Sequence, residues 1–133
     1  MKGPPIFLTT DQVLAIHRRM VDAFGGDPAV RDRGLLESAV SMPMSQFGGK
    51  YLHEGVPEMT AAYLFHICRN HAFVDGNKRT ALATAAVFAL LNGMRLVATS
   101  KELETLTVGV AAGQVSKGPV TSFFRKHLVA DQR

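Results

Sequence analysis

Cysteine is nearly absent from this sequence, since Cys68 is the one thiol among 133 residues. A lone thiol cannot form an intrachain disulfide, and a small secreted scaffold held together by disulfides is therefore excluded. Because Cys68 lies in an apolar stretch with helical spacing, we expect it to be a buried and unreactive core thiol.

Long apolar runs are missing as well. The apolar segment from Ala81 to Leu91 is too short to cross a bilayer as a helix. The first residues, Met1 to Leu8, lack the apolar core of a signal peptide. These absences predict a cytoplasmic protein that has no membrane partner.

Positive charge is in excess but is not clustered. The net charge is +4, from 15 lysines and arginines against 11 acidic residues, and no basic run is longer than two. A nucleic-acid-binding surface needs a denser basic patch, so we expect no direct, specific contact with nucleic acid. The surplus of positive charge favours association with an acidic partner through long-range electrostatic attraction.

The sequence also contains no internal repeat and no low-complexity tract, and its composition is ordinary for a globular protein. Hydrophobic residues make up 47% of the chain and charged residues 20%. Such a chain is long enough to bury a core of its own. We therefore expect residues 1–133 to form a single domain.

Apolar residues recur at helical spacing in most of the chain, and two capping boxes, Thr9-x-x-Gln12 and Thr99-x-x-Glu102, are typical of helix starts. The expected helices run from Thr9 to Gly25, from Asp32 to Pro43, over 57–70, over 78–91, from Thr99 to Gly113, and from Gly118 through Leu128. The remaining stretch, 44–57, is irregular, with Tyr51-Leu52 as its only strand-like element. These patterns predict an all-α bundle of about six helices.

Groups suited to phosphate chemistry are concentrated between the two most apolar predicted helices, in residues 71–80. His71 is a suitable general base near pH 7, and Asp75 can hold Mg²⁺ together with substrate phosphates and water. Gly76 can adopt a positive φ and let backbone N–H groups approach an anion. Phe73 is expected to anchor the loop in the core.

The helix that follows adds positive charge to the same place. Asn77 is predicted to cap its first turn, so that the free N–H groups and the positive end of the dipole face the loop, where Lys78 and Arg79 lie. Each of these residues alone is typical of a solvated turn before a helix. The combination favours a phosphate-binding loop.

The stretch resembles the motif of the Fic/Doc family, His-x-Phe-x-Asp/Glu-Gly/Ala-Asn-Gly/Lys-Arg. Seven specified positions match: His71, Phe73, Asp75, Gly76, Asn77, Lys78 and Arg79. The similarity extends from about Arg31 to Gly113. Members with the Fic form of the motif transfer AMP from ATP to a protein hydroxyl, and they carry glycine at the position of Lys78 and a second arginine at that of Leu82. At both positions the sequence resembles the Doc branch, whose toxins phosphorylate a threonine of elongation factor Tu.

The resemblance implies a set of roles for the loop residues. It implies ATP and Mg²⁺ as cofactors, with His71, Asp75, Lys78 and Arg79 in catalysis. Nucleotide binding would involve Gly76, Asn77, Lys78 and Arg79, and Asp75 would hold the metal. It also implies a compact Fic/Doc-type fold in which stretch 44–57 forms a short flap that binds the target by strand addition. The residues alone support an ordinary loop nearly as well.

Lys78 bears on which phosphate is transferred. It fills the space that a glycine would leave for the α- and β-phosphates, so the nucleotide should lie differently. The resemblance to the Doc branch implies a reversed nucleotide whose γ-phosphate faces His71. AMP transfer of the Fic type is the alternative within the family. A toxin that blocks the ribosome by binding, without catalysis, is the alternative outside it.

Self-inhibiting Fic proteins carry a helix with the pattern Ser/Thr-x-x-x-Glu-Gly/Asn, and this sequence has no match. Ser100 to Glu104 comes nearest, but Thr105 follows. By resemblance to Phd/Doc pairs, we expect restraint to come from a separate Phd-like antitoxin whose C-terminal segment folds onto this protein.

Overall fold

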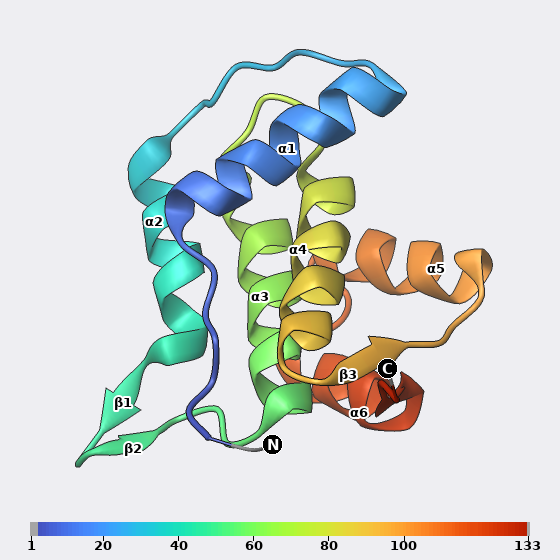
Figure 1. Ribbon diagram of the computed structural model, residues 1–133. Coiled ribbons are helices and arrows are strands. Elements are labelled where there is room, and N and C mark those ends of the chain that lie inside the picture. Colours follow the sequence, from blue (N-terminus) through green and yellow to red (C-terminus); the bar gives the residue numbers. More distant parts are fainter. Residues whose placement is uncertain (1–2, 133) are drawn as a thin grey trace.

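The computed structural model describes residues 3–132, and this part of the chain contains six α-helices and two small antiparallel sheets (Figure 1). The helices are α1 (Thr10–Phe24), α2 (Arg33–Ser41), α3 (Val56–Asn70), α4 (Asn77–Leu91), α5 (Ser100–Ala111) and α6 (Lys117–His127), with a 3-10 turn, η1, at Met42–Met44. The strands are β1 (Gln46–Phe47), β2 (Lys50–Tyr51), β3 (Met94–Leu96) and β4 (Leu128–Ala130). The expected helical fold is confirmed. Within the described residues, no helix has the length and apolar character needed to span a bilayer.

Helices α3 and α4 form the centre of the molecule and lie side by side (Figure 1). Helix α2 covers one side of this pair, α5 and α6 cover the other, and α1 crosses the end where α3 and α4 are joined. Alanines 81, 85 and 89 of α4 are fully buried, and these small side chains allow close helix packing. The 71–76 loop is thus held between two buried helices and beside α1.

Buried polar groups in the core are few. The Tyr63 hydroxyl accepts a hydrogen bond from the Leu8 N–H at 2.9 Å, and burial raises the pKa of this phenol to about 12. Burial also raises the pKa of the fully buried Cys68 thiol to about 12. The expectation of a buried core thiol is confirmed, and burial disfavours the nucleophilic thiolate.

Helix boundaries follow the local signals. Both capping boxes form, with Thr9 and Thr99 each accepting from the backbone N–H three residues later. Asp32 caps α2, and α1 ends at Gly25 with φ 83°. Asn92 ends α4, as expected, and its side chain also bonds to the backbone of Ile6.

Two segments differ from the sequence-based expectations. Stretch 44–57 contains a β-hairpin rather than a single strand-like element, because Gly48 and Gly49 adopt φ values of 59° and 79° and allow a tight turn between β1 and β2. Leu128 was expected to continue the last helix, but it begins β4, which pairs with β3. Pairing satisfies the backbone of both short segments while keeping Leu128 buried.

His53 lies in a half-buried cluster with His66 and Lys117. Its Nε2 is 3.1 Å from the Lys117 ammonium, which therefore donates to a neutral imidazole. Burial and the nearby Lys117 lower the pKa of His53. The same two causes, together with His53, lower the pKa of His66 to about 4.

This cluster should make stability depend on pH. Between pH 6.5 and about 4 the unfolded chain binds a proton at His66 that the folded chain excludes. Stability should be complete above pH 6.5 and should fall by about 1 kcal/mol as the pH decreases toward 4, allowing for screening of a half-exposed group. Urea unfolding at pH 7.5, 6 and 5 measures this decrease, and His66→Phe should flatten it. Equal slopes for both proteins would contradict the assignment.

Candidate functional site

The site begins where α3 ends. His71 follows the last residue of α3 in a left-handed conformation, with φ 48°. Its side chain is exposed, while its main-chain carbonyl accepts from the Arg31 guanidinium, through Nε at 2.8 Å and through Nη2. Arg31 thereby holds the backbone of His71 without occupying its imidazole.

The chain before α2 runs alongside the loop and fixes its path. The Val74 N–H donates to the Ala29 carbonyl at 3.2 Å, and the Arg31 N–H donates to the Ala72 carbonyl at 2.8 Å. These bonds form one isolated antiparallel bridge between residues more than 40 positions apart. Backbone hydrogen bonds to residues 29–32 therefore hold the loop in place.

Phe73 anchors the loop, as expected, and only 1% of its surface is exposed. The Asn77 side chain bonds to both backbone groups of this residue: Oδ1 accepts from the Phe73 N–H at 3.1 Å, and Nδ2 donates to the Phe73 carbonyl at 2.9 Å. The prediction that Asn77 caps α4 is thus wrong. Asn77 is the first helical residue, and the cap position belongs to Gly76, with φ 79° and no side-chain bond. An amide can satisfy two buried groups of Phe73, whereas a cap would satisfy one N–H.

Asn77→Ala should therefore destabilise the protein by more than loss of a cap. It leaves the N–H and the carbonyl of Phe73 without partners in a buried place, at a cost of roughly 1–3 kcal/mol. Asn77→Asp retains the acceptor but not the donor, and its free energy of unfolding should lie between those of the alanine variant and the wild type. Urea unfolding at pH 7 measures both. A loss for alanine within 0.5 kcal/mol, roughly the range of ordinary surface substitutions, would show that these bonds contribute little.

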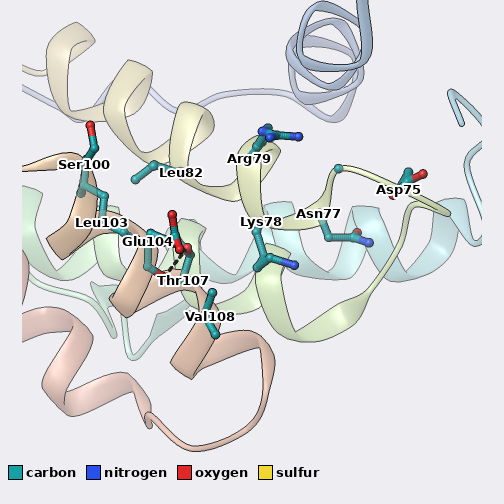
Figure 2. A pocket seen from close by; sticks show the side chains of 11 residues that line it. Asp75, Asn77, Lys78, Arg79, Leu82, Ser100, Leu103, Glu104, Thr107 and Val108 are labelled. Carbon is teal, nitrogen blue, oxygen red and sulfur yellow. Dashed lines mark hydrogen bonds between the residues drawn. The ribbon is translucent and has the colours of Figure 1, made fainter. Parts of the chain in front are cut away.

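A cavity of about 550 Å³ opens beside the start of α4 (Figure 2). Its lining combines the loop and α4 with one face of α5: Asp75, Gly76, Asn77, Lys78, Arg79, Leu82, Ser100, Leu103, Glu104, Thr107 and Val108. The structure thus brings together the predicted residues 75–79. His71 is not among the lining residues and lies at the other end of the loop.

Two positively charged side chains lie at the positive end of the α4 dipole. Lys78 and Arg79 lie in the first turn, which has no acidic residue and no side-chain cap. Cations at the positive end of a dipole reduce helix stability by about 0.3–1 kcal/mol each, and an anion bound at the free N–H groups would reverse the sign. The guanidinium of Arg79 lies 4.4 Å from the centre of the Phe24 ring, which supports its position at the cavity edge.

Asp75 is the one carboxylate in the loop. Asp75 is exposed and is among the residues that line the cavity, and its carboxylate oxygen Oδ2 accepts a hydrogen bond from the Asp27 N–H at 3.3 Å. No group of three or more metal-binding side chains occurs among residues 3–132. This donor set does not suit a fully protein-ligated metal, but it fits Mg²⁺, which commonly takes one or two carboxylates and completes its shell with phosphates and water.

The contribution of α5 was not predicted from the sequence. Leu103 and Val108 supply apolar wall, and Ser100, Glu104 and Thr107 supply polar groups, with the Thr107 hydroxyl bonded back to the Leu103 and Glu104 carbonyls (Figure 2). Leu82 of α4 faces the same space. No local pattern marks these residues, because only the packing of α5 against α4 brings them to the loop.

Comparison with known proteins adds independent information. A family model described as the Fic/DOC family matches residues 7–89. The chain is 33% identical over 119 residues to a protein named Protein kinase doc from Escherichia phage P1, covering 90% of this chain and 93% of that protein. It is 47% identical over 76 residues to Toxin Doc from Mycolicibacterium smegmatis (strain ATCC 700084 / mc(2)155), covering 57% of this chain and 58% of that protein.

Proposed function

The chain belongs to the Fic/Doc family, in its Doc branch, and from this membership we propose that it is a toxin that phosphorylates a protein hydroxyl with ATP. The proposed target is a threonine of elongation factor Tu, whose modification would block translation in the cytoplasm. The observation that carries the proposal is the joint lining of one cavity by residues 75–79, at a helix start with two cations and no cap. One relative is itself named a protein kinase.

In this proposal each residue has a defined part in the transfer. His71 accepts the proton of the target hydroxyl, whose oxygen then bonds to the γ-phosphorus. The bond from that phosphorus to the β,γ-bridging oxygen breaks, and ADP leaves. Lys78, Arg79 and the N–H groups at the start of α4 stabilise charge on the phosphates. Asp75 would hold Mg²⁺, which supplies further charge neutralisation when bound.

Two side chains support the proposed direction of nucleotide binding. Lys78 occupies the position of the glycine that Fic-type AMP transferases carry, and Leu82 leaves an apolar wall where they place a second arginine. Lys78 fills the space in which the α- and β-phosphates would lie against the helix, and Leu82 lacks the charge of that arginine. We therefore propose γ-phosphoryl transfer, with AMP transfer as the alternative.

Labelled ATP distinguishes these reactions. Incubation of the purified protein with elongation factor Tu and Mg²⁺ should label the factor from γ-labelled ATP but not from α-labelled ATP. Label from the α position would establish AMP transfer instead. Absence of either label, with active protein, would favour an inhibitor that acts by binding.

Regulation is proposed to come from outside the chain. The sequence has no self-inhibitory Fic helix, so a Phd-like antitoxin with a C-terminal segment that folds on this protein is the expected partner. The β1–β2 hairpin is proposed to be the flap that receives the target. Expression of this protein alone should arrest growth, and harmless expression in cells with an intact target would contradict the proposal.

A further inference from the structure

One histidine lies under the phosphate-binding loop and is outside the motif. His17 belongs to α1, and only 2% of its surface is exposed. Its ring stacks on Phe73, with the centroids 3.7 Å apart and the planes 7° from parallel. A polar ring buried in this way is costly unless it has a hydrogen-bond partner.

The partner is the main chain of the loop. His17 Nε2 is 2.8 Å from the carbonyl oxygen of Asp75. A carbonyl oxygen only accepts, so Nε2 must carry the hydrogen, and the neutral ring is the Nε2–H tautomer. Because stacking on Phe73 fixes the plane of the ring, the direction of this N–H is fixed as well.

The bond determines how the peptide between Asp75 and Gly76 is oriented. In a trans peptide the carbonyl and the N–H point in opposite directions, so a carbonyl held by His17 turns the Gly76 N–H away from α1. Gly76 has φ 79°, in a region that glycine enters readily, and a glycine peptide can rotate either way without steric cost. The sequence of the loop alone does not choose between these orientations.

The His17 ring lies close to Gly76. A Cβ built at position 76 would lie 3.6 Å from both Cδ2 and Nε2 of the ring, so the imidazole packs directly against this residue. On its other side Gly76 lines the cavity beside Lys78 and Arg79. His17 itself does not line that cavity.

We propose that His17 is a positioning residue for phosphate binding: by holding the Asp75 carbonyl, it directs the Gly76 N–H into the cavity, where it donates to a phosphate of the nucleotide. This inference rests on the proposed function, because it takes ATP as the ligand. His17 acts through the backbone and does not touch the substrate.

Two substitutions separate the hydrogen bond from the packing. His17→Phe retains a flat ring against Phe73 but has no donor, whereas His17→Gln retains an N–H donor near the position of Nε2 but has no ring. Both should lower the melting temperature. His17→Phe should weaken binding of ATP with Mg²⁺ at least tenfold, and His17→Gln should weaken it less than threefold. Unchanged binding by His17→Phe, or equal losses in both variants, would overturn the proposal.

Nitrogen-15 NMR tests the geometry without relying on catalysis. The wild type should show His17 protonated at Nε2, and titration with inorganic tripolyphosphate should shift the Gly76 amide signal. That shift should be lost in His17→Phe and kept in His17→Gln. A proton on Nδ1 alone, or a Gly76 shift that persists in His17→Phe, would overturn the inference. Failure of the wild type to transfer phosphate from ATP would instead contradict the proposed function.

Discussion

Replacing His71 with asparagine should reduce transfer of phosphate to the target by roughly 10²–10⁴-fold, the usual contribution of a general base. His71 has a positive φ, which asparagine tolerates better than most residues, so the backbone should be retained. The exposed imidazole makes no hydrogen bond that the described part of the structure records, and the Arg31 bond uses the main-chain carbonyl. Folding should therefore be nearly unchanged. The rate of label transfer from γ-labelled ATP measures the loss.

The control for this variant is a histidine on the far side of the molecule. His127→Asn, at the end of α6, should retain wild-type transfer, although its bond to the Val97 carbonyl would be altered. Growth arrest on expression gives a second readout. If His71→Asn stopped growth as fully as the wild type, the toxin would act by binding to its target, and catalysis by His71 would be rejected.

Replacing Lys78 with alanine should lower the rate of transfer by about 10²–10³-fold, comparable to the loss of one charge-stabilising group at a transition state. The same change should leave the free protein as stable as before or more stable by a few tenths of a kcal/mol, because a cation is removed from the positive end of the α4 dipole. Opposite effects on activity and stability are the signature of a residue placed for a ligand. Urea unfolding and the γ-label assay measure the two quantities.

A matched control is an exposed lysine away from the loop. Lys126→Ala on α6 should change neither transfer nor binding of ATP. Lys78→Gly restores the space that a Fic-type motif has and should allow label from α-labelled ATP to reach the target. Undiminished γ-phosphoryl transfer by Lys78→Ala would show that Lys78 does not stabilise charge on the transferred phosphate.

The helices were predictable because their signals are local. Capping boxes at Thr9 and Thr99, the Asp32 cap and the glycines after α1 act over three or four residues, and the structure confirms each one. The loop residues from 75 to 79 line one cavity, which follows from their being contiguous in the chain, and their roles in binding and catalysis stay a prediction. Prediction failed where a side chain had a choice of partners, as with Asn77, or where distant segments paired, as with β3 and β4.

The sequence by itself determined the kinds of chemistry present and their order: a base, a carboxylate, a flexible glycine and two cations before an apolar helix. Only the tertiary structure decided how that stretch is held, with His17 on the Asp75 carbonyl, Arg31 on the His71 carbonyl and α5 forming the opposite wall. The physical reason is that a backbone carbonyl carries no sequence signal. Which distant donor reaches it depends on how the helices pack, and that packing is a property of the whole chain.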